Sequence, residues 1–147
     1  MEVECETIIS RSRALVASYM FEPANDTQWT TGVLECRPLS PGRLRRGSRV
    51  RRTVKFGGKE FVYEYLVTDA YGDEFVEMKV EEPFPMRIRY ELQDRPEGTA
   101  VRIHTKGEPA GFFRLAAPFL KGKVRKNIAS DLANLKSQVE ELRSSPG

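Results

Sequence analysis

The chain has 147 residues, with 24 lysines and arginines against 21 aspartates and glutamates, so its net charge at pH 7 is only +3. This charge is small for a strongly basic nucleic-acid-binding protein, and 39% hydrophobic with 31% charged residues is typical of a globular chain. No apolar run approaches the roughly 18 residues that a membrane-spanning helix needs. We therefore expect one domain over residues 1–143, followed by a short tail over 144–147.

The beginning of the sequence and its few cysteines indicate the compartment. The first ten residues, MEVECETIIS, are acidic where a signal peptide is basic, and they lack an apolar core, which predicts a cytoplasmic protein. Cys5 and Cys36 are then expected to be free, buried thiols. With His104 as the single histidine, no zinc cluster or histidine-centred triad is expected, and no cofactor or metal either.

The first third of the chain predicts a strand, two short helical pieces and a second strand. Residues 2–9 alternate between apolar or small and acidic side chains, the pattern of a half-buried strand. A short helix follows, with Ser10 or Ser12 as its N-cap and Pro23 after its end, and a second helical turn precedes Trp29. Next come a short strand over 33–37 and a polar loop over 38–48.

The clearest local pattern is a hairpin. Two strand-like runs, 50–56 and 59–68, are joined by Gly57-Gly58, and such a pair of glycines suits a tight turn because both positions can require positive φ. The turn fixes the register and places Arg52 opposite Tyr63. One face, which we expect to point inward, then carries Val50, Arg52, Val54, Phe61, Tyr63, Tyr65 and Val67.

Three further strands and a long helix complete the predicted elements. Alternating patterns predict strands over 74–80, 86–92 and 99–105, so that the hairpin continues into an antiparallel meander. Apolar residues then recur at three- and four-residue steps, which predicts an amphipathic helix. These residues are Val124, Ile128, Leu132, Leu135, Val139 and Leu142. Pro118 and Gly122 predict a kink near the start of this helical segment.

These elements predict an α+β fold. A curved antiparallel sheet with one apolar face must cover that face, and the C-terminal helix is the only long element available. We therefore expect about seven strands wrapped around this helix, with the two short helices after the first strand closing one end.

This order of elements resembles the START-like helix-grip superfamily, in its polyketide cyclase/dehydratase and lipid-transport branch (SRPBCC). The similarity extends from Val3 to Leu142. Its motifs are Trp29 followed by Thr-Thr-Gly-Val33, Gly47, the Gly57-Gly58 hairpin, the run from Tyr63 to Asp69, the strand Pro-Met-Arg-Ile-Arg-Tyr90, Gly98-Thr99 and Leu115-Ala-Ala-Pro118. These motifs support the fold far better than any activity, because the family has no universal catalytic signature.

The resemblance implies a deep cavity between sheet and helix in which apolar small molecules bind, and the residues suit it. The inward face combines apolar walls with hydroxyls and one cation, as ligand pockets do. The predicted ligand-binding residues are Arg52, Val54, Phe61, Tyr63, Tyr65, Met78, Ile88, Tyr90, Phe113, Ala117, Leu120 and Val124. The alternative is that these side chains close-pack as core.

Several single residues leave two interpretations open. Arg52 either points inward, to anchor a ligand carboxylate or polarise a carbonyl, or extends to the rim and pairs with a glutamate. The tyrosines on the inward face are either hydrogen-bond donors to a ligand or aromatic core. Glu35 and Asp131 are candidate bases if buried, but no partner for either is evident.

A basic segment gives a further possibility for the function. Six arginines lie between Arg43 and Arg52, and with Lys121, Lys123, Arg125 and Lys126 they suggest a patch for phosphates or transient contact with anionic lipid. The loop lacks the aromatic residues of a nucleic-acid platform, so no nucleic acid is expected.

The predicted function is binding of a hydrophobic small molecule, lipid or polyketide-like. The alternatives are a polyketide aromatase/cyclase or dehydratase and an interaction module using the basic patch. A monomer or a homodimer is expected.

Overall fold

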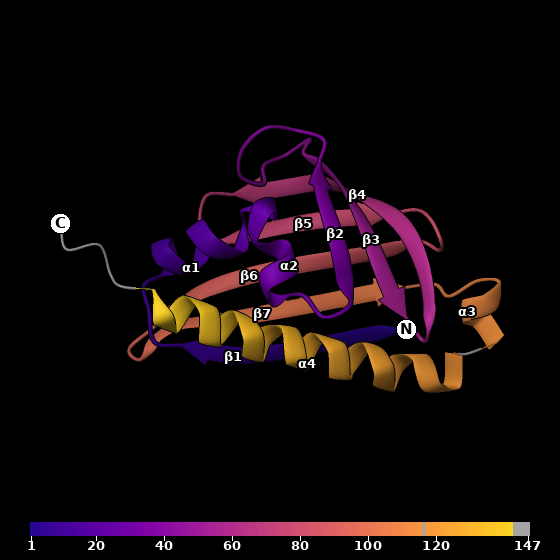
Figure 1. Ribbon diagram of the computed structural model, residues 1–147. Helices are drawn as coiled ribbons and strands as arrows, with labels where there is room; N and C mark the ends of the chain where they lie inside the picture. The colour runs from indigo at the N-terminus through magenta and orange to yellow at the C-terminus, as the bar shows by residue number, and fades with distance from the viewer. Residues whose placement is uncertain (116, 143–147) are drawn as a thin grey trace.

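Seven antiparallel strands form one strongly curved sheet in the computed structural model (Figure 1). The structure describes residues 1–115 and 117–142, apart from the side chains of Phe112 and Ala117. The spatial order is β1-β7-β6-β5-β4-β3-β2. The strands are β1 (Glu2–Ile9), β2 (Val33–Pro38), β3 (Arg49–Phe56), β4 (Lys59–Tyr71), β5 (Phe75–Val80), β6 (Met86–Arg95) and β7 (Gly98–Gly107). The predicted meander is therefore confirmed, and β1 joins it by pairing with β7.

The hairpin of β3 and β4 has the register that its two glycines predict. Val54 lies opposite Phe61, Arg52 opposite Tyr63, and Val50 opposite Tyr65. On the other face Arg51 donates hydrogen bonds to Glu64, as expected of a solvated cross-strand pair. The register sets which side chains of this hairpin point toward the interior.

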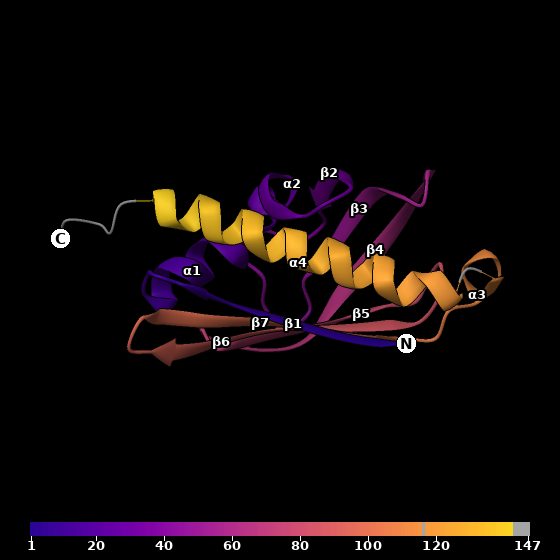
Figure 2. The same ribbon diagram turned by 90° about the horizontal axis from the view of Figure 1, so that it is seen from below.

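The short helices begin where the sequence places their signals. Ser12 caps α1 (Arg13–Met20) by accepting a hydrogen bond from the Leu15 N–H at 3.2 Å. A turn of 3-10 helix, η1 (Pro23–Asn25), leads directly into α2 (Asp26–Trp29), the predicted helical turn before Trp29. Figure 2 shows α1, α2 and the C-terminal helix on the same side of the sheet.

The long helix α4 (Ala117–Glu141) lies across the concave side of the sheet and packs mainly on β1 and α2. Its apolar stripe is the predicted one: Leu132, Leu135 and Val139 are almost completely buried. Its far end is held by polar contacts, because the Ser10 N–H and hydroxyl both donate to the Glu140 carboxylate at 2.9 and 3.0 Å.

The start of the helical segment differs from the prediction of a kink at Pro118 or Gly122. A separate one-turn helix, α3 (Phe112–Leu115), precedes α4, and α4 then runs through both residues without interruption. Pro118 lies in the first turn of α4, where its missing N–H removes no intrahelical hydrogen bond. The predicted tail over 144–147 lies outside the described residues.

Gly32 connects α2 to β2, and its conformation supports a test of how the site is positioned. Its φ is +83°, and an added Cβ would lie 2.7 Å from the Lys55 carbonyl oxygen. Gly32→Ala is therefore expected to lower the free energy of unfolding by about 1–3 kcal/mol. Gly122→Ala is the control, because a Cβ there meets nothing within 4 Å, and it should stabilise the protein by about 0.5–1 kcal/mol. Urea unfolding measures both effects, and equal stabilities of the two variants would contradict this account.

Candidate functional site

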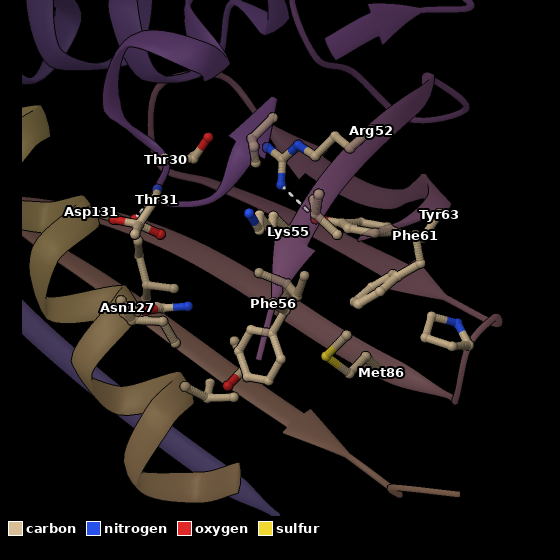
Figure 3. Close-up of a pocket in the computed structure, with 18 of the residues that line it drawn as sticks. Thr30, Thr31, Arg52, Lys55, Phe56, Phe61, Tyr63, Met86, Asn127 and Asp131 are labelled. Carbon is tan, nitrogen blue, oxygen red and sulfur yellow. Dashed lines mark hydrogen bonds between the residues drawn. The ribbon is translucent and has the colours of Figure 1, made fainter. Parts of the chain in front are cut away.

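A pocket of about 170 Å³ lies between the sheet and the N-terminal half of α4 and is partly open to solvent. Side chains from β3, β4, β6 and β7 form one wall, and side chains from α3 and α4 form another. Thr30 and Thr31, which follow α2, also line the pocket, as do Val33 of β2 and Pro83 and Phe84 of the turn after β5. Figure 3 shows Thr30, Arg52 and Asp131 toward one end of the pocket, with Phe56 and Met86 toward the other.

The apolar end of the pocket is an aromatic cluster centred on Phe113. The Phe113 ring lies 5.4 Å from the Phe61 ring, 5.1 Å from the Phe84 ring and 6.4 Å from the Phe56 ring, measured between centroids. Leu120 from the first turn of α4 packs in the same cluster. These side chains come from the β3–β4 hairpin, the turn after β5, and the α3–α4 segment, so three separate parts of the chain close this end.

The polar end is built on a buried ion pair between Arg52 and Asp26. The side chains are only 5% and 1% exposed. The Arg52 Nε and Nη2 both donate to one oxygen of Asp26, at 3.1 and 2.6 Å. The Arg52 Nη1 donates to the Tyr63 hydroxyl at 3.0 Å, and the guanidinium lies 4.7 Å from the centre of the Tyr65 ring. Arg52 therefore points inward as the register predicted, but its partner is an aspartate rather than a glutamate.

Burial and this ion pair together set the protonation of the polar end. Burial opposes the charged form of Arg52, but attraction by Asp26, and by the neighbouring tyrosines, raises its pKa well above the ordinary value. Burial raises the pKa of Tyr90, and the nearby Arg52 offsets this only partly. Burial likewise raises the pKa of the Cys36 thiol to about 12, with Asp26 adding to the effect. The buried Tyr90 therefore stays neutral and keeps its hydroxyl proton.

Asp131 of α4 brings a carboxyl group to the pocket wall. It accepts a hydrogen bond from the Thr31 N–H, which ties the helix to the segment after α2. Burial raises the pKa of Asp131 from 3.8 to about 6, although the hydrogen bond from Thr31 and the charge of Arg52 favour its ionised form. Figure 3 shows Asp131 and Arg52 on two sides of the pocket. A group with a pKa near 6 can exchange a proton close to neutral pH.

Thr105 of β7 adds a hydroxyl with no partner to the lining. Within the described chain, the buried side-chain polar atoms without a hydrogen-bond partner are those of Tyr19, Trp29 and Thr105. Of these three residues only Thr105 lines the pocket. An unpaired buried hydroxyl in a pocket wall is free to bond a ligand or water.

The structure brings most of the predicted ligand-binding residues to one pocket. Its lining includes Arg52, Val54, Phe61, Tyr63, Ile88, Tyr90, Phe113, Leu120 and Val124. Tyr65 and Met78 are almost fully buried behind this wall, where Tyr65 lies under the Arg52 guanidinium and Met78 packs in the main core. The predicted contact of Ala117 concerns a side chain outside the described part of the chain. Contact of these residues with a ligand stays a prediction.

The sequence did not reveal Asp26, Thr31, Asn127 or Thr105 as part of the site. Asp26 lies in the predicted helical turn before Trp29 and has no distinctive pattern around it, but an arginine with an inward register requires a buried acid, and that requirement is the available signal. The interpretation of Asp131 left its burial open, and the structure settles it by placing the carboxyl in the pocket wall. Glu35 is exposed and lies 3.9 Å from Arg37, so it is not a buried base.

The predicted basic patch is not one surface. The arginines between Arg43 and Arg52 lie in the β2–β3 loop and β3, whereas Lys121 lies near the start of α4, at another part of the molecule (Figure 1). Three of these arginines are paired with acids: Arg43 with Asp73, Arg51 with Glu64 and Arg52 with Asp26. Among the described residues the bases near the start of α4 have no such ion-pair partner.

A curved sheet around a C-terminal helix, with a partly open apolar pocket between them, defines a protein of the helix-grip class. The chain belongs to the polyketide cyclase / dehydrase and lipid transport family, whose profile matches residues 1–140. The predicted resemblance and fold class are thus confirmed. No curated protein sequence matches the chain.

Solved structures with little sequence identity share the fold. A START superfamily protein from Mycobacterium smegmatis is 17% identical, with a TM-score of 0.78 over 97% of this chain and 99% of that one. The TTHA0849 protein from Thermus thermophilus is 19% identical, with a TM-score of 0.78 over 95% and 97%. The di-domain ARO/CYC StfQ of the steffimycin biosynthetic pathway is 12% identical, with a TM-score of 0.77 over 95% of this chain and 50% of that one.

Removing one member of the buried ion pair tests its role in stability. Arg52→Met leaves the Asp26 carboxylate buried without its cation and is expected to lower the free energy of unfolding by about 3–5 kcal/mol. Combining it with Asp26→Asn should recover part of this loss. The matched control is Arg51→Met, the next residue, whose exposed ion pair with Glu64 is expected to contribute only about 0–1 kcal/mol. Urea unfolding of the wild type and these variants decides the point, and similar losses at positions 51 and 52 would contradict it.

The raised pKa of Asp131 predicts a pH dependence of stability. Between pH 3.8 and about pH 6, the folded protein keeps a proton on Asp131 that the unfolded chain releases. The stability that this proton contributes is therefore fully present below the ordinary pKa of 3.8. It is lost as the pH rises through the folded-state pKa of about 6. Asp131→Asn should match the wild type at about pH 3 and be more stable than it at about pH 7.5. Unfolding curves at both pH values test this, with exposed Asp69→Asn as the control, and a pH-independent difference would refute it.

Proposed function

We propose that this protein binds a hydrophobic small molecule, lipid or polyketide-like, in the pocket between the sheet and α4. The observation that carries this proposal is a pocket with an aromatic end around Phe113 and a polar end around Arg52. Most small-molecule sites combine an apolar wall with a few convergent polar groups in this way. Such a pocket would hold an elongated ligand in one orientation.

The polar end favours a neutral acceptor over a carboxylate. Asp26 already compensates the charge of Arg52, so a second carboxylate would meet a neutral pair rather than a free cation. The groups around the pair, the hydroxyls of Tyr63 and Tyr90, suit a carbonyl or hydroxyl on the ligand. Lys55 lines the pocket as an exposed cation and is available to a ligand group near solvent.

We place this function in the cytoplasm. Cys5 and Cys36 are both free and only partly buried, which suits a reducing compartment. None of the described helices is both long enough and apolar enough to span a bilayer.

An enzyme of the aromatase/cyclase or dehydratase type is the second candidate, because Asp131 combines a pocket position with a pKa of about 6. In this alternative the Tyr63 and Arg52 side chains would polarise a ligand carbonyl. The Asp131 carboxylate would take a proton from the carbon next to it. Such a reaction needs the ligand held between Asp131 and Arg52, the two sides of the pocket in Figure 3.

Blocking the pocket tests the proposed function. Val124→Trp puts a large side chain into the lining and should weaken binding of the neutral fluorescent probe Nile red at least about tenfold. Ala129→Trp, at an exposed position of the same helix, should bind as the wild type does. Native mass spectrometry of freshly purified protein should also show a bound hydrophobic molecule that the Val124 variant lacks. Equal probe binding by both variants would overturn the proposal.

A further inference from the structure

The most exposed large apolar side chains of the described residues lie at one end of the molecule. Leu115 of α3 is 86% exposed, and Phe119 in the first turn of α4 is 81% exposed. Their neighbours Phe113 and Leu120 are buried and line the pocket. The same short segment therefore closes the pocket on its inner side and presents two large apolar groups to solvent on its outer side. Two such groups are too few for the core of a stable protein interface.

Basic residues accompany these two side chains. No acidic residue occurs between Glu108 and Asp131, whereas Arg114, Lys121, Lys123, Arg125 and Lys126 do. All five bases are exposed, and none has an ion pair among the described residues. On α4, Lys123 and Lys126 follow Phe119 by four and seven residues, so they lie on the same face of the helix as Phe119.

The β3–β4 hairpin adds further bases at this end. The Phe56 ring contacts the Phe113 ring, and the Lys123 ammonium lies 6.0 Å from the centre of the Phe56 ring. Phe56 stands next to Lys55, and Lys59 begins the next strand. Acids are also present: Glu60 lies opposite Lys55 in the hairpin, and Glu108 precedes α3. Bases still outnumber acids in this part of the sequence.

The shape of this end is convex. Both ribbon views show α3 projecting past the ends of the strands (Figures 1 and 2). A peptide or a folded partner needs a groove or a wide complementary face, whereas a bilayer accepts protruding apolar side chains and pairs its headgroups with surrounding bases. We propose that the α3–α4 end of the molecule, defined by Leu115, Phe119, Lys123 and Lys126, docks on anionic phospholipid bilayers, with Leu115 and Phe119 inserted among the headgroups.

The charge and apolar contributions have separate consequences. The bases attract an anionic surface before contact, and each lysine near the surface changes the affinity about fivefold. The apolar pair then enters the interface, as in other proteins that lie on a membrane without crossing it. Docking would bring the aromatic end of the pocket next to the bilayer. The docking itself does not require an occupied pocket, so its test is independent of the proposed function.

Vesicle co-sedimentation tests this inference. The wild type should bind vesicles of phosphatidylcholine with phosphatidylserine, bind vesicles of phosphatidylcholine alone much more weakly, and lose binding as salt is raised. Leu115→Ser/Phe119→Ser should lower the affinity at least about tenfold, and Lys123→Gln/Lys126→Gln by about 25-fold, since the two lysines act together. Tyr71→Ser and Arg45→Gln, an exposed aromatic residue and an exposed base elsewhere, are the matched controls and should bind as the wild type does.

A direct probe of insertion complements the affinities. The single native tryptophan, Trp29, is 1% exposed, so in Phe119→Trp the new indole reports on position 119. Its emission should shift to the blue when phosphatidylserine vesicles are added. All the substituted side chains are exposed, so thermal unfolding should give wild-type midpoints. Absence of wild-type binding, or unchanged binding by the Leu115/Phe119 variant, would overturn the inference. The inference would also be overturned if the Leu115/Phe119 variant lost a self-association that the wild type shows in sedimentation velocity but still bound vesicles. The patch would then join two copies of the chain.

Discussion

The buried ion pair between Asp26 and Arg52 is the interaction on which the rest of the site depends. It joins α2, a four-residue helix, to the middle of β3. A charge this deeply buried is tolerated only when it is paired and hydrogen-bonded, and here one oxygen of Asp26 receives two of the guanidinium's donors while the Tyr63 hydroxyl accepts from a third. The pair thus fixes where the helical connection sits over the sheet, and Thr30 and Thr31 follow directly from that connection into the pocket wall.

The same pair sets the electrostatic character of the pocket. Since Asp26 neutralises Arg52, the ion pair itself adds little net charge to the polar end of the pocket. That end favours hydrogen-bond acceptors by geometry rather than by attraction of an anion. Asp131 on the facing helix is half-buried and forms no ion pair in the described chain, so partial burial raises its pKa, whereas the pKa of Arg52 rises because Asp26 attracts its charge. Asp26 therefore serves as the fixed counter-charge of Arg52, which is its hydrogen-bond partner. Asp131 has no guanidinium partner among the described residues and can gain or lose a proton.

The sequence predicted the fold almost completely and the site only partly, for a common physical reason. Strand alternation, the Gly57-Gly58 turn and the helical stripe are local patterns, so they indicated the strand order along the chain and the register of Arg52 opposite Tyr63. The partner of Arg52 is 26 residues away in sequence, in a segment whose own pattern predicts only a short helical turn. Contacts between segments without strong periodicity depend on the closed fold, and no local pattern encodes them.

The apolar segment that forms α3 and the start of α4 contributes both to the pocket wall and to the exposed surface. The sequence reads as nearly continuous hydrophobic residues from Gly111 to Leu120, and a core helix alone would bury them all. The structure divides them: Phe113 and Leu120 close the pocket, while Leu115 and Phe119 remain in solvent. Exposed groups of this size have a cost in water and contribute nothing to the fold. Their position next to bases that lack an ion pair in the described chain points to a second surface. The pocket and that surface share one backbone segment, so any movement of the segment at a membrane would also change the aromatic end of the pocket.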